Sequence, residues 1–336
     1  MAPIPGTPEW HRQVVEDIVD PDRRIVDPHH HLFGRGHPSR YRLADLWEDT
    51  GSGHRVEKTV FIECHLAYRN DGPDHLRPVG ETEAVAEAAE RSEQGAEGQA
   101  RIAGIVAHAD LTLGEDVAEV LDAHEAAGGG RFKGIRHAEP SALDPRAPII
   151  PGRPAANLYG GEAFRKGVAE LGKRGLTYET YHMHYQNKDF AQLAGAVPDT
   201  IMILDHFGTP VGVGPFAGRR DAVFDYWKSD IADIARRPNV FAKLGGMAMP
   251  VNGFGWDQRQ MPPTSDEFAA AQRAYYLHTI ECFGPDRCMF ESNFPVDKYS
   301  LSYPVLWNGL KKIVQDFTEG EKDAMFSGTA TEIYRL

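Results

Sequence analysis

Segments with the pattern of buried β-strands alternate with helical segments along almost the whole chain, and six consecutive strand-like segments end in histidine. Alternation of this kind is typical of βαβ units and a parallel sheet. In a parallel barrel the carboxyl ends of all the strands meet on one face. We therefore expect these imidazoles to surround one pocket. The six segments are residues 24–31, 59–65, 102–108, 131–137, 178–184 and 201–206.

Two more strand-like segments, residues 239–246 and 288–293, follow the first six. Together the segments predict a (β/α)₈, TIM-like barrel over residues 24–336, with residues 1–23 as an N-terminal extension against its outside. An open doubly wound sheet would normally carry a glycine-rich phosphate-binding turn after its first strand, where this chain has three histidines. Long loops rich in glycine and proline should lie over the active face, at residues 69–80, 139–161 and 247–263.

The composition limits the classes of molecule that this protein is expected to bind. The net charge of −13 disfavours nucleic acid, whose phosphates need a basic surface. The three cysteines lack the spacing of a disulfide framework, and no apolar run approaches the length that spans a bilayer. The first residues lack the features of a secretory signal. We expect a cytoplasmic protein that binds a small-molecule substrate and neither nucleic acid nor membrane, and barrels of this size often form homodimers.

The first strand ends in Asp27-Pro28-His29-His30-His31. Residues two apart in a strand point to the same side, so His29 and His31 should both reach the barrel mouth while His30 points outward. Two such imidazoles form half of a first-row metal site. A histidine-rich surface loop is the alternative. It is disfavoured because five other strand ends carry histidine at the same face.

Several motifs occur together in the order of one known family. They are IVDPHHHLF, FKGIRH, LDHFGTP, KLGG and FESNFPVD, which span the first strand to the eighth. The chain resembles the amidohydrolase superfamily, in the amidohydrolase-related (amidohydrolase 2) branch that includes sugar-lactone and 2-pyrone-4,6-dicarboxylate lactonases. The resemblance implies a (β/α)₈ fold and attack of water on a lactone, ester or amide carbonyl. Decarboxylases and hydratases also belong to the superfamily.

The resemblance also assigns roles to particular residues. Arg136 takes the fourth-strand place, where a guanidinium would bind a substrate carboxylate or lactone oxygen. Gln186 completes the fifth-strand pattern, with His182 as an extra imidazole on the same side. The histidines in the family's catalytic positions, which would also hold a divalent Zn or Mn ion, are His29, His31, His184 and His206.

The eighth strand departs from the family pattern. Asn293 stands where the superfamily usually has an aspartate that takes a proton from water, and an amide cannot act as a base. Asp297 is the preferred replacement, because its loop can fold back over the mouth. Glu291 would lie deeper in the barrel, and a histidine base is an equal alternative. The change also leaves open a metal-free reaction, in which a base activates water and arginine and histidines stabilise the oxyanion.

Other polar residues near the strand ends are candidate substrate contacts. Glu63 needs a partner if it is buried, so a structural ion pair with an arginine or lysine is the alternative for it. Hydrogen-bonded structural histidines are the alternative for the histidines. Besides Arg136, His182 and Gln186, the candidate substrate contacts are Glu63, His65, His108, His137, Tyr181, Lys243 and Asn293.

The first functional hypothesis is hydrolysis of a small cyclic ester whose ring is carboxylated or polyhydroxylated. The second is metal-dependent decarboxylation or hydration of a ring carboxylate on the same scaffold. The third is a barrel that binds a small acidic ligand without catalysis, which the Asn293 position favours.

Overall fold

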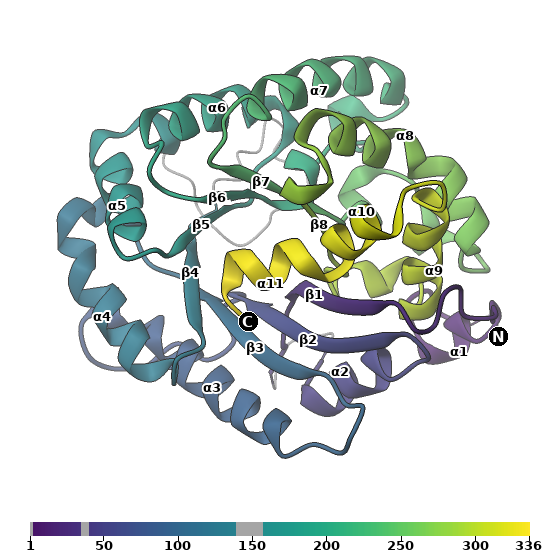
Figure 1. Cartoon of the computed structure of the whole chain (residues 1–336), viewed down its shortest axis with the longest axis horizontal. Coiled ribbons are helices and arrows are strands. Elements are labelled where there is room, and N and C mark those ends of the chain that lie inside the picture. The colour runs from purple at the N-terminus through teal and green to yellow at the C-terminus, as the bar shows by residue number, and fades with distance from the viewer. Residues whose placement is uncertain (1–2, 35–39, 139–156) are drawn as a thin grey trace.

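The structure is a computed structural model that describes residues 3–34, 40–138 and 157–336. Eight parallel strands pair in chain order and form the ring that Figure 1 shows end-on. The barrel predicted from the alternating pattern is therefore confirmed. The strands are β1 (Arg24–His30), β2 (Arg55–Ile62), β3 (Arg101–Ala107), β4 (Phe132–Arg136), β5 (Thr177–Thr180), β6 (Met202–Leu204), β7 (Val240–Leu244) and β8 (Cys288–Phe290).

Helices surround this ring, and each helix packs one of its faces against the outer side of the strands (Figure 1). The shortest, α1, lies in the N-terminal extension, where the buried Trp10 donates from Nε1 to the carbonyl oxygen of Arg259 at 3.0 Å. The α-helices are α1 (Pro8–His11), α2 (Leu43–Thr50), α3 (Val79–Glu93), α4 (Ala118–Ala127), α5 (Glu162–Lys173), α6 (Asn187–Ala196), α7 (Arg220–Ile234), α8 (Ser265–Phe283), α9 (Tyr303–Ile313), α10 (Glu319–Asp323) and α11 (Thr329–Tyr334).

The chain segment after β8 joins the ring to β1. The backbone N–H of Asn293 donates to the carbonyl oxygen of His29 at 3.0 Å, and the N–H of His31 donates to that of Phe294 at 2.8 Å. A register irregularity in β1 between Asp27 and His30 changes the direction in which the side chains there point. The first and last strands therefore meet at the end of the barrel that carries His29 and His31.

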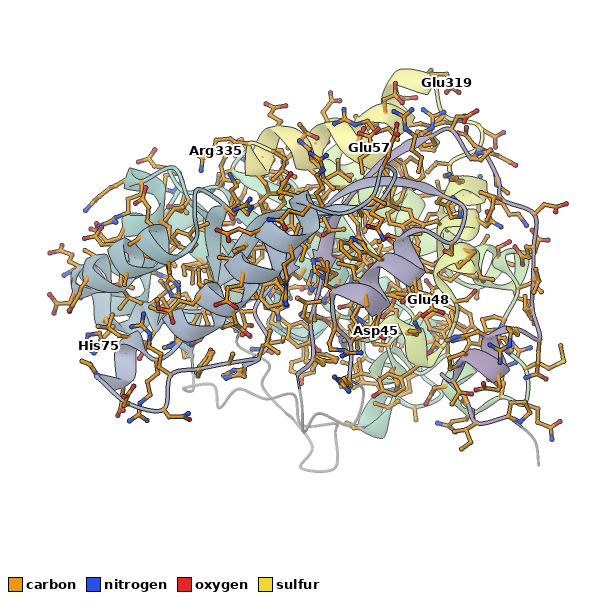
Figure 2. All side chains as sticks on the ribbon, turned by 90° about the horizontal axis from the view of Figure 1, so that it is seen from below. Asp45, Glu48, Glu57, His75, Glu319 and Arg335 are labelled. Atoms are coloured by element: carbon orange, nitrogen blue, oxygen red, sulfur yellow. The ribbon has the colours of Figure 1, made fainter. Side chains whose placement is uncertain are left out.

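The opposite end of the barrel is covered by α11, which crosses the centre of the ring in Figure 1. Figure 2 shows the same arrangement from the side, with Arg335 on one side of the molecule and the loop of His75 on the other. Tyr334 packs fully buried among apolar residues of the inner strands, including Val26, Val106 and Met289. The C-terminal helix thus fills this end of the barrel, and the strand-end histidines lie at the other end.

Some predicted boundaries differ from the observed ones. The fifth strand ends at Thr180 and not at His184, because a 3₁₀ turn at His184–Gln186 reverses the chain. The helix Leu43–Thr50 was not expected. Most of the expected loop 139–161 lies outside the described residues. Among those described, no helix has the length and apolar character needed to cross a membrane.

Candidate active site

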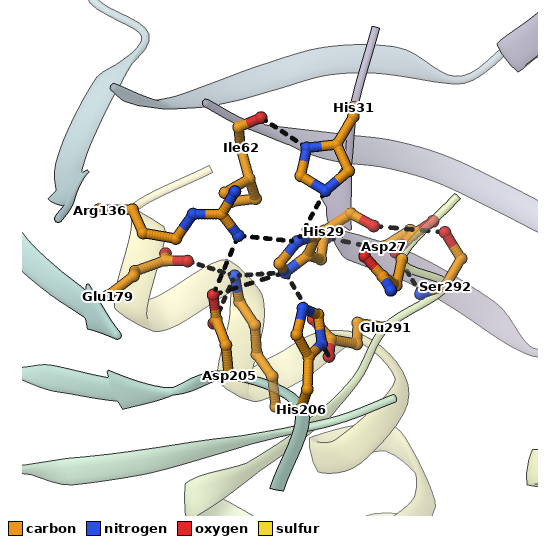
Figure 3. Close-up of polar contacts among 12 residues, drawn as sticks. Asp27, His29, His31, Ile62, Arg136, Glu179, Asp205, His206, Glu291 and Ser292 are labelled. Carbon is orange, nitrogen blue, oxygen red and sulfur yellow. Dashed lines mark hydrogen bonds and ion pairs between the residues drawn. The ribbon is translucent and has the colours of Figure 1, made fainter. Parts of the chain in front are cut away.

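A buried carboxylate holds two of the predicted histidines at the centre of the barrel mouth (Figure 3). Glu291, which directly follows β8, lies with Oε2 at 2.8 Å from Nδ1 of His29 and with Oε1 at 2.6 Å from Nδ1 of His206. The rings of His29 and His206 lie 4.5 Å apart, centroid to centroid. Residues from the first, sixth and eighth strands therefore form one buried cluster.

Contacts at Nδ1 orient both histidines of the first strand. Nδ1 of His31 donates to the carbonyl oxygen of Ile62 at 2.8 Å, and Nδ1 of His29 lies 2.8 Å from Oε2 of Glu291 and 3.4 Å from Nζ of Lys243. Burial lowers the pKa of His29 and His31 well below the ordinary value, so both rings are neutral. The Nε2 atoms of the two rings face each other at 3.3 Å, and Nη1 of Arg136 lies 3.4 Å from that of His29. This arrangement is the kind that orients histidines toward a metal ion.

An ionic layer lies beneath the histidines. Nζ of Lys243 on β7 lies 2.5 Å from Oε2 of Glu179, 3.5 Å from Oδ1 of Asp205 and 3.4 Å from Nδ1 of His29. Tyr334 donates its hydroxyl to Oε1 of Glu179 at 2.5 Å. Burial alone would lower the pKa of Lys243, but Asp205 and Glu179 raise it, so the ammonium stays charged. The site is thus held from below by paired charges.

Arg136 forms the neighbouring wall of the site. Its Nε donates to Oε1 of Glu63 at 2.8 Å and its Nη2 donates to the carbonyl oxygen of the same residue at 2.7 Å. Nη1 lies 3.4 Å from Nε2 of His29 and 3.5 Å from Oδ2 of Asp205. The ion pair considered for Glu63 is therefore present. Binding of a substrate carboxylate by Arg136 stays a prediction, and all three of its guanidinium nitrogens already make hydrogen bonds, those of Nη1 being the longest.

The backbone at the strand ends adopts unusual conformations. His206, Phe207 and Thr209 have positive φ angles of 54°, 59° and 40°, and Asn293 has a φ of 55°. Such strain tends to occur at functional sites. The second glycine of KLGG is Gly246, which has a φ of 67°. A Cβ at this position would lie 2.3 Å from Nδ1 of His206, so no larger residue fits. A larger residue at this position would displace the imidazole from Glu291.

Asn293 and Asp297 form a pair beside this cluster. The amide nitrogen of Asn293 donates to Oδ1 of Asp297 at 3.0 Å, and the N–H of Ala248 donates to Oδ2 at 3.2 Å. Burial raises the pKa of Asp297 well above the ordinary value. The loop does fold back as expected, but Asp297 is buried and bonded on both oxygens. Its role as a base stays a prediction.

The structure places the two fifth-strand histidines away from the cluster. Glu179 faces the barrel interior, so strand alternation turns Thr180 and His182 toward the helices. His182 is fully buried there, and its ring bonds Thr180 at 2.7 Å and Asn187 at 2.9 Å. The expectation that His182 lies on the same side as the site residues is therefore wrong.

His184 lies in the 3₁₀ turn, where its Nδ1 accepts from the N–H of Val211 at 3.2 Å and its ring packs on Phe216. Among the described residues it makes no recorded contact with the central histidines. Gln186 caps the same turn by accepting from the N–H of Met183 at 3.2 Å. The roles predicted for His184 and Gln186 remain untested predictions, and the geometry lends them no support.

Other predicted residues do lie around the mouth. The ring of Tyr181 packs edge-on against His206, with centroids 5.6 Å apart. His65 and His108 follow β2 and β3 beside Glu63, with ring centroids 5.9 Å apart. His137 lies next to His108 but accepts at Nδ1 from the N–H of Leu111 at 3.1 Å and packs on α5. His30 turns away toward Phe61, as expected.

The sequence reasoning missed three members of the buried network. Glu179 and Asp205 pair with Lys243, and Asp27 accepts from the N–H of Ser292 at 2.9 Å and from the hydroxyl of Tyr303 at 3.0 Å. A signal for all three was present, because each is a carboxylate within or directly after a strand and a buried carboxylate needs partners. Tyr334 had no such local signal.

The spacing of the donor atoms is close to that of ligands around a metal ion. Two zinc–nitrogen bonds of about 2.0–2.1 Å at a tetrahedral angle span about 3.4 Å, close to the 3.3 Å between the Nε2 atoms of His29 and His31. Ligand atoms of His29, His206 and Glu291 also lie within 4.8 Å of one another. The residues therefore fit a divalent ion, with Glu291 either as a ligand or as the group that orients the histidines.

Comparison with known proteins agrees with this geometry. The sequence profile of a family described as Amidohydrolase matches residues 26–336. An uncharacterized protein, y4mH, from Sinorhizobium fredii is 31 % identical over 94 % of this chain and 99 % of its own length. An L-fucono-1,5-lactonase from Burkholderia multivorans is 27 % identical over 93 % of this chain and 96 % of its own.

Solved structures share the fold. A zinc-bound amidohydrolase from Burkholderia multivorans has a TM-score of 0.71 at 21 % identity, covering 93 % of this chain and 99 % of the other. A manganese-bound 5-carboxyvanillate decarboxylase from Novosphingobium aromaticivorans has a TM-score of 0.59 at 11 % identity, covering 94 % and 97 %. From the barrel, the strand-end histidines and the profile match over nearly its full length, the chain belongs to the amidohydrolase 2 family.

Proposed function

We propose that this chain is a lactonase, a hydrolase that opens a small cyclic ester with an activated water molecule. The observation that carries the proposal is the facing pair of Nε2 atoms on His29 and His31, 3.3 Å apart, with Glu291 beside Nδ1 of His29 and the carbonyl oxygen of Ile62 bonded to Nδ1 of His31. The similarity to an L-fucono-1,5-lactonase supports the choice of ester chemistry.

His29 and His31 would hold the divalent ion, with His206 and Glu291 as further candidate ligands. Zinc is favoured by the zinc found in the amidohydrolase from Burkholderia multivorans. When bound, such an ion supplies Lewis-acid polarisation of a carbonyl and lowers the pKa of water. Glu291 accepts from Nδ1 of His206 at 2.6 Å, which leaves Nε2 of that ring as a donor of an electron pair, and its other oxygen lies 2.8 Å from Nδ1 of His29, where it would favour the same tautomer. Nη1 of Arg136, 3.4 Å from Nε2 of His29, lies where it can stabilise negative charge that develops on a substrate oxygen.

Two buried carboxylates are candidates for the proton acceptor. Burial raises the pKa of Asp205 and of Asp297, and a base works best when its pKa is near the working pH. Asp205 is adjacent to Arg136 and Lys243, whereas Asp297 is linked to the mouth through Asn293. We favour Asp297, since it shares a loop with Asn293 at the family's usual base position. An alanine or asparagine variant at each position would separate the two.

The proposal is tested with purified protein and a panel of lactones, esters and amides, read by a pH indicator with and without added Zn²⁺ or Mn²⁺. We expect one equivalent of acid for each lactone ring opened. The matched variants His31→Asn and His184→Asn compare a central histidine with one outside the cluster. No turnover above buffer across the panel with either metal would overturn hydrolysis.

Decarboxylation of a ring carboxylate is a second candidate. It needs no base to activate water, so the amide of Asn293 would be no handicap, and the fold is shared with a manganese-bound decarboxylase. Release of carbon dioxide from an aromatic carboxylate without ring opening would identify it.

A further inference from the structure

A second group of polar and aromatic side chains lies at the rim of the barrel mouth, outside the histidine–Glu291 cluster. Its members follow two neighbouring strands, β2 and β3. We call it the rim cluster, and it consists of Glu63, His65, Tyr68 and His108.

The rings of the rim cluster lie close together. Centroids of His65 and Tyr68 are 4.6 Å apart, those of His65 and His108 are 5.9 Å apart, and those of Tyr68 and His108 are 6.4 Å apart. The planes of each pair are inclined by 22–35°. The rings of His65, Tyr68 and His108 thus form a small, nearly parallel aromatic wall, of the kind on which the C–H face of a ring-shaped ligand can pack.

Glu63 supplies a carboxylate at the base of this wall. Its side chain is only 7 % exposed, and Arg136 binds Oε1, while Oε2 lies 4.0 Å from Nε2 of His65. Burial alone would raise the pKa of Glu63, but Arg136 outweighs burial and lowers it, so the group stays ionised. An ionised carboxylate accepts hydrogen bonds from hydroxyls and repels a second carboxylate.

His108 is held so that one nitrogen remains for a ligand. Its Nδ1 donates to the carbonyl oxygen of Arg136 at 3.1 Å, which leaves Nε2 as an acceptor. Its own carbonyl oxygen accepts from Nε2 of His124 at 3.0 Å, and Thr82 bonds the other nitrogen of that ring at 2.8 Å. Within the described part of the chain, Nε2 of His108 and the buried hydroxyl of Tyr68 have no recorded hydrogen-bond partner.

The cations nearest the rim cluster are already paired. Arg136 gives Nε and Nη2 to Glu63, and Lys243 is fully buried against Glu179. Among the described residues at this wall, the groups left for a ligand are therefore an acceptor carboxylate, imidazoles and a phenol. This set matches hydroxyl groups, which both donate and accept, and does not match a carboxylate.

We propose that the rim cluster is a subsite that binds the hydroxyl groups of a neutral, polyhydroxylated ring and so selects the substrate. The assignment rests on the proposed lactonase function for its reaction and names the class of lactone. Glu63 accepts from ring hydroxyls, His108 accepts through Nε2, and the aromatic wall covers one face of the ring. A ring dicarboxylate should bind more weakly, because it would approach the ionised Glu63 while Arg136 is already paired with Glu63 and Asp205.

The test pairs a small change in the protein with a small change in the ligand. In His108→Asn the amide nitrogen can replace Nδ1 in the bond to the carbonyl oxygen of Arg136, while Nε2 is removed. The matched control is His75→Asn, which changes a surface histidine paired with Glu119. For a six-membered polyhydroxylated lactone we expect kcat/KM to fall about tenfold in His108→Asn. For the deoxy lactone that lacks the contacted hydroxyl we expect little change. Equal losses on both lactones would overturn the subsite.

Calorimetry with a polyhydroxylated six-membered lactam, which retains the hydroxyls and resists hydrolysis, tests the subsite without turnover. We expect the parent protein to bind the lactam, and His108→Asn to bind it about tenfold more weakly. If lactam binding behaves in this way but no lactone is opened, the subsite stands and the hydrolytic function fails. Absent lactam binding, or tighter binding of a ring dicarboxylate, would overturn the subsite.

Discussion

Replacement of Glu291 by glutamine tests how the central histidines are oriented. Oε1 of the carboxylate accepts from Nδ1 of His206 at 2.6 Å, and Oε2 lies 2.8 Å from Nδ1 of His29. Glutamine offers one oxygen and one NH₂ group, so its amide nitrogen would face an imidazole N–H. One ring must then move its proton to Nε2, which removes the lone pair directed at the metal position.

The expected loss can be estimated from the role of such supporting groups. Removing a carboxylate that orients a histidine ligand typically lowers metal affinity 10- to 100-fold, or about 1.4–2.8 kcal/mol. Zinc affinity would be measured by competition with a chromophoric chelator, and lactone turnover by a pH indicator. We expect Glu291→Gln to lose both affinity and turnover while its circular dichroism spectrum is unchanged.

A matched control is available in another buried glutamate. Oε1 of Glu81 accepts from the N–H groups of Cys64 and Leu66 at 3.0 and 2.7 Å, and a glutamine oxygen can keep both bonds. Glu81→Gln should therefore leave zinc affinity near that of the parent. If Glu291→Gln binds zinc as tightly as the parent and Glu81→Gln do, the proposed orientation of the histidines is refuted.

Three further predictions concern stability. Gly246→Ala should lower the free energy of unfolding by at least about 1–2 kcal/mol, because the residue has a φ of 67° and the new Cβ would meet His206; an unchanged urea midpoint would contradict this. Tyr334→Phe removes the hydrogen bond to Glu179 and should cost about 1.5–3 kcal/mol in the same assay, whereas a loss below about 0.5 kcal/mol would show that the bond contributes little. The buried histidines should make the fold less stable in acid between pH 6.5 and 4, because the unfolded chain binds protons there that the folded one excludes, whereas Asp205 and Glu291, whose pKa burial raises to about 7 and about 8, act in the opposite direction; a urea midpoint that rises from pH 7 to 5 would contradict a dominant role for the histidines. The buried histidines responsible, whose pKa burial lowers to about 4, include His30, His124 and His182.

The fold could be predicted because strand and helix periods are local properties of the sequence. The same alternation correctly placed His29 and His31 together and His30 apart. It failed at the fifth strand, because the sequence does not show which residues there point into the barrel. Glu179 points inward and pairs with Lys243, so His182, three residues later, points outward and bonds Asn187.

Long-range contacts were not predictable in the same way. Tyr334 reaches Glu179 from the last helix, and nothing near either residue in the sequence signals the pairing. Glu291 was recognised as facing the same way as Asn293, but the two bonds that make it central depend on the positions of three strands. The second glycine of KLGG matched a family motif, and its physical reason appears only when His206 is placed against it.

The most direct test of the account is anomalous diffraction at the zinc absorption edge from crystals soaked in Zn²⁺. We expect one strong peak within bonding distance of Nε2 of both His29 and His31, next to His206. A peak at another group of side chains, or no peak at this position at a zinc concentration that saturates the protein in solution, would contradict it.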